Sequence, residues 1–467
     1  LPSGEIMKNV FKLTILLSAL GVALPLHATP TATPETWGGD FASRPRLTGD
    51  WGGARDDMAN KGVTLDVDTY WMPQTILSGG KDETSASWGN VIVAFQVDTG
   101  KAGLWKGGHF KVQTVTSLGD NLISDTGTFA PANLSWLLPS IEPATGLQEF
   151  TYTQFFSEHF GVFLGKINSI APTNVLHGDY TTGFLNTSLN LPLTLDLMPL
   201  SAYGVGALYL PSHDVTLVAM VLDPNGTIKN NDLGDAFDDG ATTLVSADLK
   251  VKPAGLLGHH NLAFTWSNKN RTSLIQDPAN VARIFLESRY PLLGDPGPIL
   301  SEIFDELGIS PNADPLNMED DTWAAVYSFE QFLWQPEGAP TRGVGVFFSA
   351  GVSDGNPNPV KSSYSLGLVG KGMVPNRPHD NFGIGWARTV LSDDFLRELR
   401  ALPLNLGMDY EDVGELYYNV SIRPWLSVGP SRQIVSPAVN KTFDPTSQAF
   451  KDLDTTYIAG VRVGIRF

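Results

Sequence analysis

Apolar and polar residues alternate over many short segments of this chain, most clearly in residues 457–467. Val461 and Phe467 fall on one face of an extended strand, and Arg462 and Arg466 fall on the other, because successive side chains of a strand point to opposite faces. One face suits hydrocarbon and the other suits water. A soluble sandwich also alternates, but its apolar face would then be the core face.

Sixteen segments carry this alternation, and each is predicted to be a strand. The predicted strands span residues 63–78, 88–101, 107–118, 147–158, 160–168, 201–211, 213–223, 241–252, 259–269, 321–335, 343–352, 363–371, 382–391, 410–422, 425–435 and 456–467. Short connections, such as 423–424, alternate with long ones, such as 169–200 and 270–320. We therefore predict an all-β fold, a transmembrane antiparallel up-and-down β-barrel of about 16 strands with short periplasmic turns and long extracellular loops. A barrel of this size leaves an aqueous channel.

The first residues have the pattern of an export signal. A basic segment at 7–12 and an apolar run at 13–24 precede a small residue, Ala28, suited to cleavage. The run is shorter than the ~20 residues that a spanning helix needs, which disfavours the alternative of a retained anchor. Before the first strand, Asp50 and Gly62 are placed to begin and end a short helix. The predicted domains are upstream residues and a signal peptide at 1–28, a flexible leader at 29–46, a periplasmic N-terminal helix at 47–62 and a β-barrel domain at 63–467.

Composition narrows the chemistry. The chain has no cysteine, so disulfides and thiolate metal sites are excluded. Its formal net charge of −18 argues against nucleic acid as a partner. The chain contains no nucleophile-elbow, zinc-protease or phosphate-loop motif, so we expect neither an enzyme nor a cofactor.

Four motifs, three of them in two parts, together resemble a known family, the carbohydrate-selective porins of the OprB type. They are residues 47–53 (LTGDWGG) through 61–63 (KGV), 104–110 (LWKGGHF), 367–372 (GLVGKG) with 375–380 (PNRPHD), and 415–418 (ELYY) with 424–427 (PWLS). Each motif is short, but their order and spacing extend the resemblance over residues 47–467. The resemblance implies passive, selective diffusion of sugars, glucose above all, across the outer membrane of a Gram-negative bacterium.

Two other functions stay open at this point. One is a general-diffusion porin for small hydrophilic solutes, and the other is a secreted glycan-binding or glycan-cleaving β-protein. For a porin, the expected partners are small sugars as permeating solutes, outer-membrane lipid and lipopolysaccharide. The barrel-assembly machinery is a further expected partner, through the C-terminal strand that ends in Phe467.

A sugar channel needs polar groups that replace the water shed by a passing solute yet release the solute again. Residues on the polar face of the predicted strands are the candidates for the pore wall and its constriction. They are Asp66, Asp68, Gln96, Lys111, Gln113, Glu149, Lys166, Asn168, Glu415, Tyr417, Asn419, Gln433 and Arg462. Lys111, Glu149, Lys166 and Glu415 are the preferred candidates for the narrow zone, and the alternative for each is a wet wall without selectivity. Tyr70 and Tyr417 are predicted to stack on sugar rings.

The remaining candidates have plainer alternatives. Trp51, Trp71, Trp88, Trp105, Trp386 and Trp425 are predicted to form interface girdles rather than a sugar slide. Asp232, Asp235, Asp238 and Asp239 are a weak calcium candidate, with a solvated acidic loop as the alternative. The pair at 259–260 is predicted to be surface histidines rather than a metal site. Residues 285–307 either form helices that fold inward or belong to a disordered outer loop.

Overall fold

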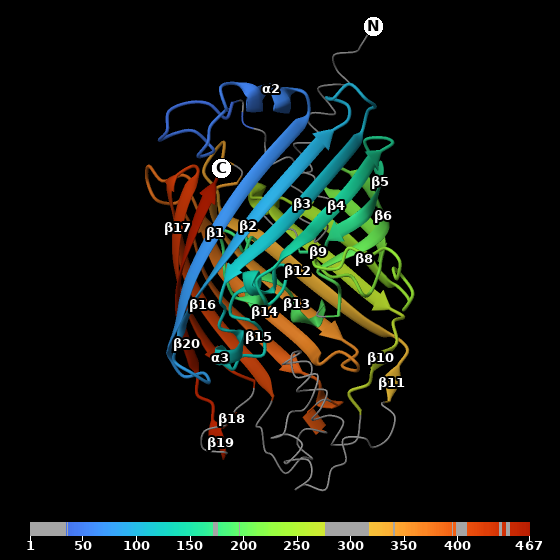
Figure 1. The fold of residues 1–467 in the computed structure, drawn as a ribbon, viewed down its shortest axis with the longest axis vertical. Coiled ribbons are helices and arrows are strands. Elements are labelled where there is room, and N and C mark those ends of the chain that lie inside the picture. The colour runs from blue at the N-terminus through green and yellow to red at the C-terminus, as the bar shows by residue number, and fades with distance from the viewer. Residues whose placement is uncertain are drawn as a thin grey trace.

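Sixteen strands form one closed antiparallel barrel in this computed structural model (Figure 1). The structure describes residues 34, 36–170, 176–195, 197–275, 317–339, 341–394, 396–397, 409–438, 441–444 and 449–467. The barrel strands are β1 (Val63–Ser78), β2 (Ser85–Asp98), β3 (Gly108–Gly119), β4 (Thr145–Phe155), β5 (Phe160–Asn168), β6 (Ser201–Ser212), β7 (Val215–Leu222), β8 (Thr242–Val251), β9 (Gly258–Ser267), β12 (Thr322–Trp334), β13 (Gly343–Ser353), β14 (Val360–Lys371), β15 (Asn381–Leu391), β16 (Tyr410–Arg423), β17 (Leu426–Ser436) and β20 (Thr456–Arg466). Every predicted strand is confirmed, and its ends lie within three residues of the predicted ones.

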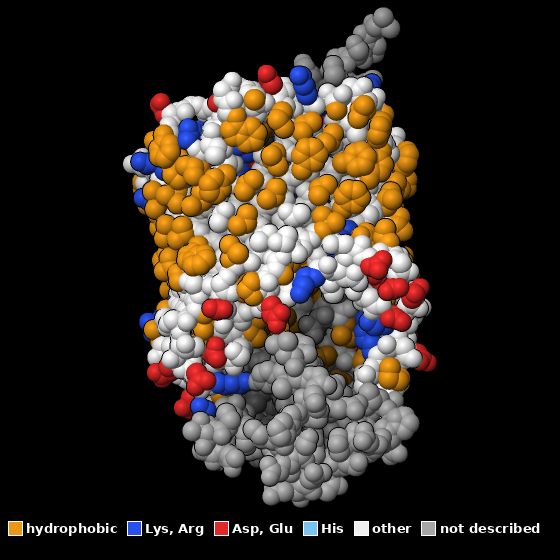
Figure 2. Space-filling view, in the orientation of Figure 1, with side chains coloured by type: hydrophobic (Ala, Val, Ile, Leu, Met, Phe, Trp, Pro, Cys, Tyr) orange, Lys and Arg blue, Asp and Glu red, His pale blue; other side chains and the backbone are white. Residues whose placement is uncertain are grey.

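The two faces of the barrel wall have the predicted characters. On β16, Leu416 is 56% exposed on the outer face, whereas Glu415 and Tyr417 are 2% and 3% exposed on the inner face. On β20, Val461 faces outward and Arg462 inward. On the face shown in Figure 2, hydrophobic side chains form a broad band, and charged side chains lie mainly above and below it. The apolar face therefore meets lipid rather than a second sheet.

Closure of the barrel removes every free strand edge from the wall. The first strand, β1, pairs with the last, β20, with Thr69 opposite Ile465 and Asp68 opposite Arg466. A closed sheet satisfies the backbone of every strand, as a hydrocarbon environment requires. Among the described residues, no helix is long and apolar enough to cross a membrane.

The segment before β1 packs against the end of the barrel where the sheet closes. Its helix, α2 (Ala54–Asn60), is shorter than predicted, and Asp50 caps a turn at Gly52 instead of the helix itself. Arg55 of α2 donates hydrogen bonds to the carbonyls of Leu65 (2.8 Å) and Phe467 (3.1 Å). Two residues of the predicted leader also contact this end: the carbonyl of Phe41 accepts a hydrogen bond from Trp425 (2.8 Å), and Arg46 pairs with Asp66 (2.8 Å).

Gly62 ends the predicted helical region with a left-handed backbone. Its φ of 78° is unfavourable for residues with a side chain, and a Cβ there would lie 2.6 Å from the carbonyl oxygen of Asp98. Glycine is therefore required where the N-terminal segment enters β1.

Smaller elements lie outside the wall. At the end of the barrel opposite α2, two hairpins pair β10 (Arg271–Thr272) with β11 (Met318–Glu319), and β18 (Lys441–Asp444) with β19 (Ala449–Asp452) (Figure 1). A 3₁₀ turn, η3 (Pro253–Gly255), joins β8 to β9 at the α2 end. The predicted inward helices at 285–307 lie outside the described residues.

The turn between β14 and β15 is fixed by one carboxylate. Asp380, 3% exposed, accepts hydrogen bonds from the side chain of Arg377, the backbone N–H of Ser421 (2.9 Å) and the hydroxyl of Tyr418 (2.8 Å). Burial opposes ionisation, but these hydrogen bonds and the Arg377 charge outweigh it and hold the pKa of Asp380 below its ordinary value. The ionised carboxylate therefore stabilises the folded turn.

The outward face of β16 supplies a direct test of lipid exposure. Leu416→Arg, at mid-strand, is expected to destabilise the barrel by about 2–4 kcal/mol, whereas Ile422→Arg, near the strand end, costs about 0–1 kcal/mol. Urea unfolding of the protein from lipid vesicles measures both values. Equal costs at the two positions would contradict the assignment of the membrane midplane.

The lowered pKa of Asp380 predicts the pH dependence of the Asp380→Asn variant. A lowered native pKa contributes stability above the unfolded-state pKa of about 3.9, and this contribution is lost as the pH falls through the native value. Wild type should therefore exceed Asp380→Asn in unfolding free energy at pH 7, and the difference should shrink below about pH 4. Denaturant titrations from pH 7 to pH 2 measure it; a difference that stays constant with pH would exclude this role.

Candidate functional site

One connection crosses the interior of the barrel and is the main feature of the lumen. It starts after β5, and its described residues 176–195 (the crossing segment) include α4 (Thr187–Asn190) and the 3₁₀ turn η2 (Leu193–Leu195). α4 contacts β14 and β15, and η2 contacts β12, β13 and β14. Because these strands lie far around the barrel from β5, the crossing segment spans the lumen and divides it.

Side chains of the wall hold the backbone of the crossing segment. Glu415 of β16 accepts the N–H groups of Leu185 (2.8 Å) and Asn186 (2.9 Å) with its two carboxylate oxygens. Arg462 of β20 donates to the carbonyls of Tyr180 (2.7 Å) and Gly183 (2.9 Å). Two strands thereby fix the middle of the segment inside the barrel.

A third strand holds the beginning of the crossing segment. Glu330 of β12 accepts the N–H of Leu176 at 2.8 Å, and His177 stacks on Phe347 of β13 with ring centroids 4.2 Å apart. Sequence reasoning missed Glu330. The available signal is a carboxylate on the inward phase of an apolar strand, a position that is costly without a partner.

The connection between β3 and β4 also folds inward. It contains α3 (Ile123–Thr126) and the 3₁₀ turn η1 (Leu134–Leu137). Glu411 accepts the N–H of Ala130 (2.9 Å), Asn133 donates to Gln74 (2.7 Å), and Gln433 donates to the carbonyl of Ala132 (2.8 Å). The N–H of Leu134 donates a hydrogen bond to the carbonyl of Leu185 in the crossing segment (2.8 Å). The two inward segments therefore support each other, and Glu411 is a second anchor that the sequence did not reveal.

Three lumen candidates, of which Glu415 was a preferred one, are buried against the crossing segment. Glu415, Tyr417 and Arg462 face inward as predicted but are only 2%, 3% and 2% exposed. The Tyr417 ring meets the edge of Phe184 at a centroid distance of 4.8 Å. The prediction that these side chains contact solute is therefore wrong, because they bind or pack against the crossing segment instead.

The candidates on β2–β5 form internal polar contacts. Lys111 and Glu149 make an ion pair of 2.8 Å, with side chains 10% and 0% exposed. Gln113 donates to Gln148 (2.9 Å), and Asn168, 3% exposed, accepts the N–H of Ile170 (3.2 Å). Lys111 and Glu149 satisfy each other, so their proposed place in the narrow zone is also corrected. Asn419 is 3% exposed and lies opposite Asn381 in the β15–β16 register.

Lys166 does not face the lumen. It lies in register with Phe150 and Tyr203, and Phe150 is 52% exposed on the outer face. The ammonium group lies under the loop that follows β7, donating to the carbonyl of Asn230 (2.6 Å) and the side chain of Asn231 (2.7 Å). The predicted phase was wrong for the strand as a whole, since Leu164, two residues before Lys166, is 49% exposed on the outer face.

Partly exposed polar groups gather at the tip of the crossing segment. Asp179 accepts hydrogen bonds from the N–H of Thr181 (2.9 Å) and the hydroxyl of Thr182 (2.7 Å). Burial opposes ionisation, but these hydrogen bonds outweigh it and lower the pKa of Asp179. Asp179 also interacts electrostatically with Arg466, which lies opposite Asp68 on the wall. We call Asp68, Arg466, Asp179, Thr181 and Thr182 the polar rim.

The wall beside the polar rim carries balanced charge. Arg46 pairs with Asp66 (2.8 Å) and with Asp68, and Arg55 also pairs with Asp66 (2.9 Å). Tyr70 is 6% exposed and packs in one buried cluster with Met72 and Trp88. The predicted stacking platform at Tyr70 is therefore wrong, because its ring is buried.

The predicted tryptophan girdle is wrong for two of its members. Trp71 and Trp105 are 43% and 46% exposed, so both face outward, and their place in a girdle stays a prediction. Trp88 is fully buried inside the barrel, donating to the carbonyl of Ser135 at 2.9 Å. Trp425 packs against Phe41 of the N-terminal segment, and neither Trp88 nor Trp425 belongs to a girdle. Trp51 lies in the N-terminal segment beside Arg55, and Trp386 is half-buried on β15.

The structure also places the acidic calcium candidates and the histidine pair. Asp232, Asp235, Asp238 and Asp239 lie in the exposed loop after β7, where the described residues form no group of three or more potential metal ligands. His260 faces outward beside Tyr327 (2.7 Å), but His259 faces inward and is 2% exposed. The prediction of two surface histidines is wrong for His259.

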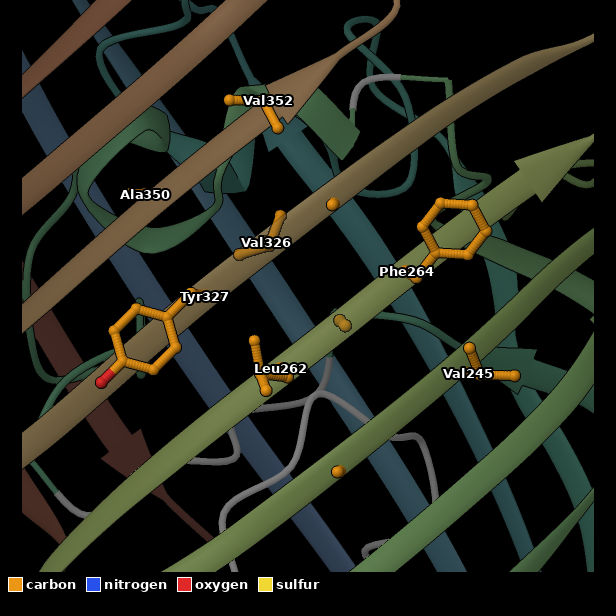
Figure 3. Close-up of a pocket in the computed structure, with 10 residues that line it drawn as sticks. Val245, Leu262, Phe264, Val326, Tyr327, Ala350 and Val352 are labelled. Atoms are coloured by element: carbon orange, nitrogen blue, oxygen red, sulfur yellow. The ribbon is translucent and has the colours of Figure 1, made fainter.

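One hollow of the molecule lies outside the lumen. It is lined by outward side chains of β8, β9, β12 and β13, including Leu262, Phe264 and Tyr327, with the small Ala325 and Ala350 between them (Figure 3). Apolar lining on the lipid-facing wall suits hydrocarbon chains and offers nothing to a polar solute. The hollow is therefore no transport site.

The protein is a closed barrel with an apolar wall that faces lipid and with segments that fold into its interior. These features together define an outer-membrane porin. The family model described as carbohydrate-selective porin, OprB family, matches residues 82–467. The chain belongs to this family, whose members are channels rather than enzymes, and it is a sugar porin of a Gram-negative outer membrane.

Individual relatives agree with this assignment. Porin B of Pseudomonas aeruginosa is 22% identical, over 96% of this chain and 95% of its own length. The high-pH structure of Pseudomonas putida OprB has a TM-score of 0.71 at 20% identity, covering 92% of this chain and all of that one. The low-pH structure of the same protein has a TM-score of 0.51 at 17% identity, covering 91% and 99%. At these identities, the solved structures establish a shared fold.

The anchoring role of Glu415 predicts two linked effects of Glu415→Ala. Two buried N–H groups lose their acceptor, so the unfolding free energy should fall by at least about 2 kcal/mol. The freed segment should also raise the single-channel conductance in planar bilayers.

Asp412→Ala is the matched control for this test. Asp412 lies on the same strand and pairs with Arg388 at a partly exposed position, so its loss costs about 0–1 kcal/mol and leaves conductance unchanged. Unchanged conductance in Glu415→Ala would contradict the anchoring role.

Proposed function

We propose that this porin passes neutral monosaccharides of the glucose type, and that the polar rim is the narrow zone that selects them. The observation that carries the proposal is the fixed position of the crossing segment. The segment holds Asp179, Thr181 and Thr182, which are partly exposed, beside Asp68 and Arg466. Anchors on three different strands keep this tip in place.

The composition of the polar rim favours neutral, hydroxyl-rich solutes. Carboxylates accept hydrogen bonds, the guanidinium donates them, and the two threonine hydroxyls do both. A ring of one charge would select ions. Asp68 and Arg466 are instead cross-strand neighbours of opposite charge, so the polar rim offers a hydroxyl-rich solute hydrogen-bond acceptors and donors side by side.

The proposed transport is passive and needs no cofactor or catalytic group. A general-diffusion porin is the nearest alternative, because a wet polar wall alone passes small solutes according to size. A soluble glycan-binding or glycan-cleaving protein does not agree with the lipid-facing wall. We also propose that the strand ending in Phe467 is recognised by the barrel-assembly machinery, since β20 is the strand that closes the barrel.

Swelling of liposomes that contain the protein tests the selectivity. Glucose should enter faster than an amino acid of similar size and faster than a disaccharide. Arg466→Ala should reduce the preference for glucose over the amino acid at least about threefold, because a charged hydrogen-bond donor is lost.

The matched control is Arg423→Ala. Arg423 ends β16 at an exposed position and its guanidinium donates to the carbonyl of Ile422, so the preference should stay at the wild-type value. Equal entry rates of glucose and the amino acid through the wild-type protein would favour the general-diffusion alternative.

A further inference from the structure

Charged side chains interrupt the apolar outer wall of the barrel on three neighbouring strands. Arg388 of β15, Asp412 of β16 and Arg432 of β17 face outward, and we call them the outer charged cluster. They share this face with Leu416 and Ile434, which are 56% and 47% exposed. A charge on a lipid-facing wall is costly, and the cost falls toward the membrane interface. The partners of these charges therefore indicate what contacts this part of the wall.

Arg388 is held in place with one edge left free. Its Nε and Nη2 donate to the two carboxylate oxygens of Asp412, at 2.7 and 2.6 Å. The guanidinium carbon also lies 4.0 Å from the ring centroid of Tyr410 and 5.5 Å from that of Trp386. Its third nitrogen, Nη1, makes no hydrogen bond within the described part of the chain. A fixed donor therefore faces outward from the wall.

Arg432 is exposed and makes no ion pair or hydrogen bond with any described residue. It lies opposite Leu416 on one side and Ala459 on the other, and neither side chain can pair with it. On the extracellular side, Gly414 leaves open space, because a Cβ there would meet nothing closer than 4.0 Å. The long side chain can run over this space toward Asp412. Two arginines and one aspartate leave the cluster with a net charge of +1.

The outer charged cluster lies near the extracellular ends of its strands. Arg388 is three residues before the end of β15 at Leu391, and Asp412 is two residues after the beginning of β16 at Tyr410. Three residues correspond to about 10 Å along a strand. Aromatic rings such as those of Tyr410 and Trp386 are common at the level of lipid headgroups. The headgroups of the outer leaflet are therefore within reach of the arginines.

The apolar hollow on the outer wall belongs to the same part of the sheet. Its floor includes the small Ala325 and Ala350 (Figure 3). Ala350 lies opposite Tyr364, and Tyr364 lies opposite Arg388. Because neighbouring strands are about 4.8 Å apart, the edge of the hollow and Arg388 are separated by about 10 Å. One lipid molecule can span this distance, with a hydrocarbon chain in the hollow and its headgroup at the arginines.

The chemistry of the outer charged cluster selects an anionic headgroup. Guanidinium groups bind phosphate through charge-assisted hydrogen bonds. A phosphate placed between Arg388 Nη1 and Arg432 would supply the partner that the wall does not offer. A neutral headgroup would leave Arg432 uncompensated. The expected occupant is therefore a phosphorylated lipid, and the outer leaflet contains such a lipid in lipopolysaccharide.

We propose that the outer charged cluster and the adjoining hollow bind one phosphorylated lipid of the outer leaflet, of the lipopolysaccharide class. Arg388 and Arg432 bind a phosphate, and Asp412 holds Arg388 in position. The hollow of β8, β9, β12 and β13 receives a hydrocarbon chain. The site lies on the outside of the barrel, so it is independent of the proposed sugar selectivity.

Native mass spectrometry of the complete protein in detergent micelles, titrated with diphosphoryl lipid A, tests the site. Arg432→Gln should raise the Kd for lipid A at least about fivefold, because a charged hydrogen-bond donor is lost. Arg388→Gln should do the same. If Arg388→Gln folds poorly because Asp412 loses its partner, Arg432→Gln decides alone, since it breaks no contact with the described residues. Lipid A stripped of both phosphates should bind wild type and Arg432→Gln equally.

Two matched controls accompany these variants. Arg423→Gln removes an exposed arginine at the periplasmic end of β16, so the Kd should stay within about twofold of wild type. Ala350→Phe fills the hollow and should raise the Kd at least about threefold, because the hydrocarbon chain loses its contact with the wall. Ala207→Phe enlarges an outward alanine on β6, away from the hollow, and should leave the Kd unchanged.

Two results would overturn the inference. One is a Kd for diphosphoryl lipid A in Arg432→Gln within about twofold of wild type. The other is a dimer in detergent that Arg432→Gln dissociates, because a second copy of the chain would then cover this surface. Glucose entry into liposomes should be the same for wild type and Arg432→Gln, so failure of the lipid site leaves the proposed function intact. Loss of glucose preference in wild type would conversely leave the lipid site intact.

Discussion

The backbone of the crossing segment must find hydrogen-bond partners inside the barrel, and the rest of the lumen is arranged around this requirement. Leaving a buried N–H or C=O group unpaired costs about 1–3 kcal/mol. Glu330, Glu415 and Arg462 supply those partners from three strands. Charges that would be costly in a dry interior are thus neutralised by fixed backbone dipoles, and they determine where the segment lies.

Inward polar residues therefore do two different things in this barrel. Some, such as Glu415, are buried and hold a segment in place, while others, such as Asp68 and Thr181, stay partly exposed beside the passage. In the proposed function, selectivity comes from a tip that is held at a fixed distance from the wall. In our account, the anchors set the size of the passage and the exposed groups set its chemistry.

The sequence predicted the strands well because the two-residue period is a local property. It predicted the site poorly because the site depends on contacts between distant residues: Leu185 and Glu415 are 230 positions apart. Pattern alone places Glu415 on the inner face, but it cannot distinguish an inward side chain that is occupied from one that is free. At Lys166 the predicted phase was wrong. The strand alternates regularly, but its apolar residues Phe160 and Leu164 share the outer face with Lys166, whose side chain lies under an outer loop.

The most direct test uses the absence of cysteine from the chain. Thr181→Cys places a single thiol at the tip of the crossing segment, where a charged, membrane-impermeant thiol reagent should reduce the single-channel current in one step. Saturating glucose should slow the modification. A thiol at this position that reacts without any change in current would contradict the claim that the fixed tip borders the passage.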